Sequence, residues 1–178
     1  MDVCISLGLY ISERNEGPFK DAFVTFSSRP QLQYLTGDLI SRYRQLEMAD
    51  WGMSTNLEAT FEMILKQATK HGVPMHEMPT AILIMSDMEF DQATDRNHRA
   101  MDMIKVKYEE SGYQMPKVIF WNLCSRHNNF PVQAGEDNTA LISGFSPSIL
   151  KSVLAGEVMN PVNIMLKALN VERYSMVQ

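Results

Sequence analysis

Residues 80–87, with the sequence TAILIMSD, form a nearly continuous apolar run that ends in Ser86 and Asp87. Because neither face of this run is polar, we expect a strand that other parts of the protein cover on both faces. Strands of this kind belong to parallel sheets with helices on both sides. The run therefore favours an α/β fold over an all-helical or an all-β one.

The segments around this run alternate between the spacing of helices and the composition of strands. Apolar residues at helical spacing predict helices over residues 1–14, 38–48, 56–71, 96–112, 147–156 and 161–169. β-branched and aromatic residues predict strands over 21–28, 117–123 and 139–145, and an antiparallel edge strand over 31–35. This order predicts one domain over residues 1–178, with a three-layer, Rossmann-like α/β fold and a mainly parallel sheet.

The same spacing predicts which side chains enter the core. The predicted core positions are Val3, Leu7, Tyr10 and Ile11 in the first helix and Met103, Ile104 and Tyr108 in the fourth. Trp121 lies inside a predicted strand, and we expect its large apolar ring to be buried.

Composition and charge narrow the classes of function. The formal net charge of -5 disfavours non-specific binding of nucleic acid. No apolar run approaches the ~20 residues that a membrane span needs, and no glycine-rich phosphate loop is present. Cys4 and Cys124 lack the spacing of a metal site or of a disulfide framework. We therefore expect a cytoplasmic protein, because reduced cysteines are usual in that compartment.

Polar segments converge on one edge of the predicted sheet. Ligands of parallel sheets usually bind at the carboxyl ends of the strands. We expect three segments at that edge, namely the loop 51–56, the acidic stretch 86–91 and the stretch NLCSRHNN over 122–129. Their convergence predicts a functional site there.

The stretches WGMSTNLEA and LIMSDMEFD resemble the von Willebrand factor A-like fold and its metal-ion-dependent adhesion site. More specifically, the chain is similar to the C-terminal A-like domain of a family known only as a domain of unknown function. The resemblance extends through PFKDAFVTFSS, KYEESGYQMPKVIFWNL and ALISGFSPSILK to MLKALNVERY. The A-like domain of the Ro (TROVE) ribonucleoproteins is also similar, which implies a ribonucleoprotein context by analogy only.

This resemblance implies a divalent cation that is bound by oxygen ligands and completed by a carboxylate from a protein partner. Thr55 and Asp87 match two of the metal-binding loops, and the implied cation is Mg²⁺, Mn²⁺ or Ca²⁺. Residues at the rim, or substitutes for these ligands, are Ser54, Ser86, Glu89, Asp91 and His127.

Thr55 has a second interpretation that does not involve a metal. The sequence T-N-L-E is typical of a capping box, in which Thr55 begins the helix over 56–71 and Glu58 reaches back to its backbone N–H. A hydroxyl oxygen has two lone pairs, so the cap and the ligand can coexist.

One part of the A-like fold has no counterpart in this sequence. An Asp-x-Ser-x-Ser loop and a central strand should precede the helix over 1–14, and the metal site is incomplete without them. The segments 21–28 and 80–87 would then each lose a neighbour, and each unpaired buried backbone group costs about 1–3 kcal/mol. Three explanations are open: the sequence is an N-terminally truncated fragment, the two segments pair directly, or another chain donates the strand.

Three functions follow from these observations. The first is a non-enzymatic protein-interaction module that binds a partner through the divalent cation. The second is a structural or assembly protein with a degenerate metal site, which would self-associate through the open centre of its sheet. The third is a Mg²⁺-dependent phosphoester hydrolase that uses Asp87, Glu89 and Asp91.

Overall fold

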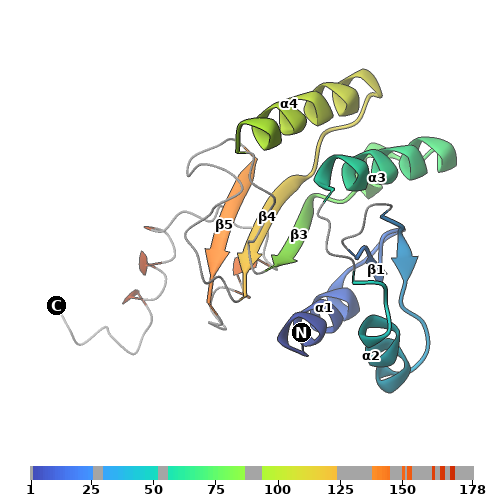
Figure 1. The fold of residues 1–178 in the computed structure, drawn as a ribbon, viewed down its shortest axis with the longest axis vertical. Coiled ribbons are helices and arrows are strands. Elements are labelled where there is room, and N and C mark those ends of the chain that lie inside the picture. The colour runs from blue at the N-terminus through green and yellow to red at the C-terminus, as the bar shows by residue number, and fades with distance from the viewer. Residues whose placement is uncertain are drawn as a thin grey trace.

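The computed structural model describes residues 2–25, 30–51, 56–86, 94–123 and 138–144, together with 150, 152–153, 162, 165–166 and 169–170. The helices are α1 (Asp2–Arg14), α2 (Leu39–Glu47), α3 (Leu57–His71) and α4 (Thr94–Glu110), with a short 3-10 helix, η1 (Met75–Glu77). The strands are β1 (Ala22–Phe23), β2 (Gln33–Tyr34), β3 (Ala81–Ser86), β4 (Lys117–Asn122) and β5 (Thr139–Ser143) (Figure 1). Most of the predicted helices over 147–156 and 161–169 falls outside the described residues.

A parallel sheet contains β3, β4 and β5 in that order. Ala81–Ser86 pairs residue by residue with Lys117–Asn122, and the register continues into β5. The connection from β3 to β4 passes through α4, because parallel neighbours need a crossover rather than a tight turn. The predicted α/β class with a parallel sheet is confirmed, whereas the finer assignment to a von Willebrand factor A-type fold is not.

Helices cover both faces of this sheet. On one face Val118 and Phe120 of β4 pack in a cluster with residues of α3 and α4. On the other face Ile119 and Trp121 cluster with Leu7 of α1. Successive side chains of a strand point to opposite faces, so β4 is buried on both, and the predicted burial of Trp121 is confirmed. Figure 1 shows α3 and α4 on one side of the sheet and α1 on the other.

We call the described residues of 2–51 the N-terminal region and those of 56–143 the sheet region. In the N-terminal region, β1 pairs with β2 in an antiparallel two-stranded sheet. A small apolar cluster joins α1, α2 and the end of β2. Its buried members are Ile5, Leu9, Leu35 and Leu46. The antiparallel strand predicted over 31–35 is confirmed only at Gln33–Tyr34, and it belongs to this separate two-stranded sheet.

The strand predicted over 21–28 is much shorter than expected. In the described part of that segment, only Ala22–Phe23 forms a strand. Residues 26–29 lie outside the described residues. β1 pairs with β2 and, among the described residues, not with β3. Direct pairing of 21–28 with 80–87, one of the three explanations for the missing strand, is therefore not observed between described residues.

The buried face of α1 differs from the predicted one. Val3 and Tyr10 are 46% and 40% exposed, so their assignment to the core was wrong. Ile5 and Leu9 are buried instead, because they pack in the cluster with α2. Leu7 was predicted correctly and contacts the cluster on the sheet. The tertiary position of α1 between α2 and the sheet decides this face.

In α4 the predicted core is right at two positions and wrong at one. Ile104 and Tyr108 are 1% and 0% exposed, and the hydroxyl of Tyr108 donates a hydrogen bond of 3.0 Å to the carbonyl of Phe61 in α3. Met103 is 54% exposed, so its prediction was wrong. It lies one residue, about 100° around the helix, from Ile104 and faces away from the cluster.

The N-cap of α3 lies one residue later than the sequence predicted, so the predicted capping box was wrong. The N-cap is Asn56, whose side chain accepts a hydrogen bond of 3.0 Å from the backbone N–H of Ala59. Glu58 does not belong to a capping box but lies 3.3 Å from the ammonium group of Lys107 in α4. Thr55, the predicted N-cap, lies outside the described residues.

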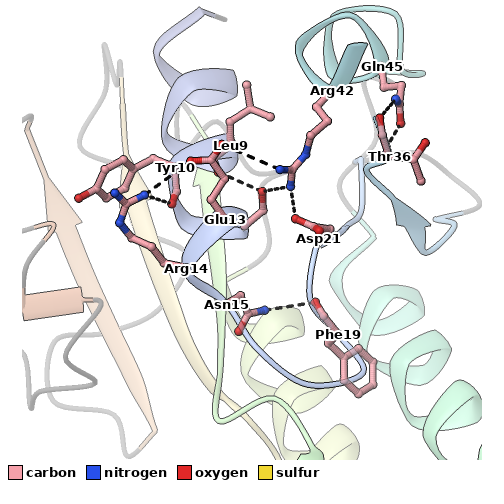
Figure 2. A network of polar contacts seen from close by, with 11 residues as sticks. Leu9, Tyr10, Glu13, Arg14, Asn15, Phe19, Asp21, Thr36, Arg42 and Gln45 are labelled. Atoms are coloured by element: carbon pink, nitrogen blue, oxygen red, sulfur yellow. Dashed lines mark hydrogen bonds and ion pairs between the residues drawn. The ribbon is translucent and has the colours of Figure 1, made fainter. Parts of the chain in front are cut away.

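A polar network holds the N-terminal region together (Figure 2). The guanidinium group of Arg42 in α2 donates to the carboxylate of Asp21 and, over 3.0 Å, to the hydroxyl of Ser12 in α1. It also lies 3.9 Å from Glu13. The Arg42 side chain is only 13% exposed, so this contact links three segments through a largely buried charge. Among the described residues, no helix is long and apolar enough to cross a membrane.

Candidate functional site

The three parallel strands each end in a polar residue at the same edge of the sheet. Ser86, Asn122 and Ser143 are the last residues of β3, β4 and β5, and they lie opposite one another in the register. Neighbouring strands are about 4.8 Å apart, so hydroxyl and amide groups form a row across this carboxyl edge. Ser86 and Asn122 also interact with other groups of the protein.

Only one of the candidate site residues falls in the described part of the chain. Ser86 lies at the carboxyl end of β3, where the sequence predicted it. Asp87 is the next residue in the chain, and Thr55 immediately precedes the N-cap Asn56. The candidates outside the described residues are Ser54, Thr55, Asp87, Glu89, Asp91 and His127.

Asn122 and Ser143 were not named individually from the sequence, although Asn122 begins the stretch 122–129 that was expected at this edge. The signal that could have identified them is simple, since each is the first polar residue after an apolar stretch of a parallel strand. Residues at that position lie at the edge where ligands of parallel sheets bind. The shared register with Ser86 then places all three in one row.

The chemistry of this row suits a hard cation only in part. Hydroxyl and amide oxygens belong to the ligand class that Mg²⁺ and Ca²⁺ prefer. Among the described residues, however, no group of three or more His, Cys, Asp and Glu side chains could hold a metal ion. The described donors at this edge are neutral, so the negative charge of such a site depends on Asp87, Glu89 or Asp91.

A second feature lies between the two regions of the molecule. A cavity of about 330 Å³ is lined by the consecutive residues Ala81–Met85 of β3 and by residues 22–24, which include β1. Because successive side chains point to opposite faces, consecutive lining residues mean that the cavity follows the edges of both strands. Packed interiors contain few voids larger than a water molecule, so a space of this size separates the two strands. We call it the groove.

Two helices form the other walls of the groove. The lining residues of α1 and α3 recur at helical spacing, so each helix presents one stripe to the groove. They are Cys4, Ile5, Gly8, Ile11 and Ser12 in α1 and Leu57, Thr60, Phe61 and Ile64 in α3. A Cβ atom on Gly8 would lie 3.6 Å from Cε of Met85, so α1 approaches the carboxyl end of β3 closely.

Cys4 contributes a thiol to the groove wall. Burial raises the pKa of this thiol above its ordinary value. The neutral thiol is therefore the dominant form at pH 7, and a neutral thiol is a poor nucleophile.

The family described as a domain of unknown function (DUF7788) matches residues 1–175. The chain belongs to this family. The match includes both the N-terminal region and the sheet region, so the groove lies within one DUF7788 domain.

A viral protein is a relative of this DUF7788 chain. The "Uncharacterized protein L728" of Acanthamoeba polyphaga mimivirus is 32% identical over 172 residues. The similarity covers 95% of this chain and 30% of the viral protein, so the chain spans less than a third of that relative's length. No solved structure matches the chain. These comparisons do not extend to a von Willebrand factor A-like domain or to a Ro ribonucleoprotein.

Proposed function

We propose that the DUF7788 domain is a non-enzymatic interaction module that binds a protein partner through a divalent cation at the carboxyl edge of its sheet. The row of Ser86, Asn122 and Ser143 carries this proposal, because it puts oxygen-bearing residues at the end of three parallel strands. Asp87, the next residue after Ser86, supplies a carboxylate in sequence.

Each residue has a stated role in the proposal. Asp87 and Thr55 are the metal ligands, and the rim consists of Ser54, Ser86, Glu89, Asp91 and His127. The cation is Mg²⁺, with Mn²⁺ or Ca²⁺ as substitutes, because all three prefer oxygen ligands, and its site is complete only when an Asp-x-Ser-x-Ser loop is supplied. The bound cation would supply the positive charge that attracts a carboxylate of the partner.

A von Willebrand factor A-like fold is part of the same proposal. It is supported by the parallel order β3-β4-β5, by helices on both faces, and by the antiparallel β1–β2 pair beyond the groove. A ribonucleoprotein context rests on analogy alone, and the cytoplasmic location rests on the use of cysteine.

Titration with Mn²⁺ tests the metal site directly. Electron paramagnetic resonance counts free Mn²⁺ in the presence of wild-type protein, Asp87→Ala and the control Asp102→Ala, whose carboxylate is exposed on α4. We expect wild type and the control to bind Mn²⁺ equally, and Asp87→Ala to bind at least about tenfold more weakly because a charged ligand is lost. Acetate, as a carboxylate probe, should change the spectrum of bound Mn²⁺.

Other outcomes would decide against this function. If wild type leaves Mn²⁺ free, or if Asp87→Ala binds it equally well, the cation site is wrong and a structural or assembly role replaces it. A spectrum that acetate leaves unchanged would remove the partner's carboxylate from the proposal. Hydrolysis of bis-para-nitrophenyl phosphate that is lost in Asp87→Ala would replace the interaction module by a phosphoester hydrolase that uses Asp87, Glu89 and Asp91.

A further inference from the structure

The tryptophan of the central strand is next to the row in sequence but lies on the opposite face of the sheet. Trp121 precedes Asn122 in β4, and its ring packs with Ile142 in the cluster on the α1 side of the sheet. Because successive side chains of a strand point to opposite faces, Trp121 points away from the face to which Asn122 and Ser143 point. Trp121 is only 1% exposed, so it is too deeply buried to contact a ligand at the row.

The indole of Trp121 nevertheless reaches the carboxyl edge. Its N–H donates a hydrogen bond of 2.8 Å to the carbonyl of Gly144, the residue that follows Ser143. In the ladder between the two strands, the N–H of Val118 donates to the carbonyl of Asn138. Backbone groups of successive residues alternate between the two edges of a strand, so the carbonyl of Gly144 also lies on the side of β4. The indole therefore fastens the chain to β4 one residue beyond the row.

Gly144 has a backbone conformation that few other residues adopt. Its φ is +95°, where a residue with a side chain is strained. A Cβ atom at this position would meet no described atom within 4 Å, so the backbone conformation rather than crowding requires a glycine. The chain leaves the direction of the strand here, and β5 ends at Ser143.

The hydrogen bond and the turn together determine where β5 ends. A buried indole N–H needs an acceptor, because an unpaired donor in the core is costly. Ser143 lies between Ile142, which is paired with Trp121, and the turn at Gly144, so its position opposite Asn122 is fixed from both sides. The side chain of Ser143 is exposed, so its hydroxyl is accessible at the carboxyl edge.

We propose that Trp121 is a positioning residue for the carboxyl edge. Its indole N–H holds the turn at Gly144 and thereby keeps the hydroxyl of Ser143 in the row that receives the cation. Trp121 touches neither the cation nor the partner and acts through the backbone from the opposite face of the sheet. This role rests on the proposed function, because the cation binds at the same row.

Trp121→Phe tests this role, because it retains a buried apolar ring and removes only the N–H donor. Electron paramagnetic resonance measures the binding of Mn²⁺. We expect binding about threefold weaker than in wild type, with a changed spectrum of the bound ion, because one of its roughly six oxygen neighbours is displaced. The matched control is Tyr108→Phe, which removes a buried hydrogen bond of 3.0 Å to the carbonyl of Phe61 on the other face. Both variants should be less stable to urea, but Tyr108→Phe should bind Mn²⁺ as wild type does.

A double-mutant cycle separates positioning from a general loss of stability. Ser143→Ala removes the hydroxyl itself and should also weaken Mn²⁺ binding by about threefold. If Trp121 acts through Ser143, the double variant should be no weaker than about threefold, whereas independent effects would multiply to about ninefold. A tryptophan that only stabilises the fold would not be coupled to Ser143 in this way.

Gly144→Ala changes the same turn from its other side. The added Cβ strains the backbone without touching a described atom, and it should weaken Mn²⁺ binding by a factor similar to that of Trp121→Phe. Gly112→Ala is the matched control, because Gly112 has a φ of +76° and likewise no described atom within 4 Å of an added Cβ. It lies between α4 and the amino end of β4, away from the carboxyl edge, so Mn²⁺ binding should be unchanged.

The outcomes distinguish this role from the proposed function. A wild type that leaves Mn²⁺ free would overturn the cation site and the role of Trp121 with it. If wild type binds Mn²⁺ and Asp87→Ala does not, but Trp121→Phe binds as wild type does, the role of Trp121 alone is wrong. Additive effects in the cycle would also overturn it. Equal weakening by Tyr108→Phe or Gly112→Ala would do the same, because the effect would then come from stability.

Discussion

The two regions that border the groove are held together by different forces. The sheet region has a continuous apolar core, in which residues of α3 and α4 pack on β3 and β4. The N-terminal region has a smaller apolar cluster of four buried residues and depends more on the polar contacts of Arg42. Apolar burial is large and non-directional, whereas a buried ion pair stabilises only one geometry.

This difference explains how two separate walls can keep the groove open between them. In the sheet region, the apolar core around β3 holds this strand in place. In the N-terminal region, the contact of Arg42 with Asp21, the residue before β1, holds β1 in place. α1 then spans both, because it joins the cluster with α2 and also contacts the sheet through Leu7. The comparison predicts distinct responses to mutation in the two regions.

The largest effect should follow from a cavity in the sheet region. Phe120 is 0% exposed in the central strand β4. Phe120→Ala should lower the free energy of unfolding by about 3–5 kcal/mol, because it loses apolar burial and leaves a void. Urea denaturation followed by circular dichroism measures this. The control Met103→Ala, at an exposed position of α4, should change stability by less than about 0.5 kcal/mol, and a similar loss in both would contradict the packing described here.

The ion pair of the N-terminal region should give a smaller but clear effect. Asp21 has a positive φ of 61°, a conformation that Asn also tolerates, so Asp21→Asn removes the charge without adding backbone strain. We expect a loss of about 2 kcal/mol, because Arg42 keeps a largely buried charge without its partner. Denaturation by urea at low and high salt checks this value.

Glu13→Gln is the matched control for that variant. Glu13 lies 3.9 Å from Arg42, and its side chain is 44% exposed, so the contact should contribute no more than about 1 kcal/mol. If Glu13→Gln and Asp21→Asn had the same effect, Arg42 would act as a surface charge and the contrast between the two regions would disappear.

The cap of α3 should contribute less than the ion pair. Asn56→Ala removes the acceptor for the N–H of Ala59, and we expect a loss of about 1 kcal/mol in the free energy of unfolding. Asn56→Ser retains an acceptor and should recover most of that loss. If Glu58→Ala lowered the free energy of unfolding by about 1 kcal/mol and Asn56→Ala did not change it, the capping box predicted from the sequence would be correct.

Strong local patterns were predictable from the sequence. The strands β3 and β4 were predicted to within a residue, because a continuous apolar run bounded by polar residues has few other interpretations. The face of α1 was not predictable in this way. Val3, Ile5, Leu7, Leu9 and Ile11 fall at every second position, which spreads apolar residues around most of a helix. Only the tertiary contacts with α2 and the sheet select the buried ones.

The groove shows the same limit. The resemblance to A-like domains implied that the segments 21–28 and 80–87 would lack a common neighbour, but it did not predict how these segments are arranged. Whether two strands close on each other depends on the helices above and below them, and here α1 and α3 line both sides of the space. For the candidate site, only Ser86 could be checked, and the roles of Thr55 and Asp87 stay predictions.

The smallest expected effect concerns the helix caps of the two regions. Their contributions to stability should differ in how they depend on pH. Asp38 caps α2 with a carboxylate, whereas the neutral Asn56 caps α3. Hydrogen bonds from Ser41, one of them 2.9 Å from its N–H, hold the pKa of Asp38 below its ordinary value. A lowered pKa in the folded state means that the charged cap stabilises the protein above its ordinary pKa of about 4.

That contribution should disappear as the pH falls through the pKa of the folded state, because the protonated side chain is the weaker acceptor. Asp38→Asn keeps a capping oxygen and removes only the charge. We therefore expect the variant to be slightly less stable than wild type between pH 5 and 7, roughly, and equal to it once the pH has fallen below the pKa of the folded state. Unfolding by urea across this range measures the difference. The difference in stability between Asn56→Ala and wild type should be constant over the same pH range. If it changed with pH as much as the difference for Asp38→Asn, this distinction between the two regions would disappear.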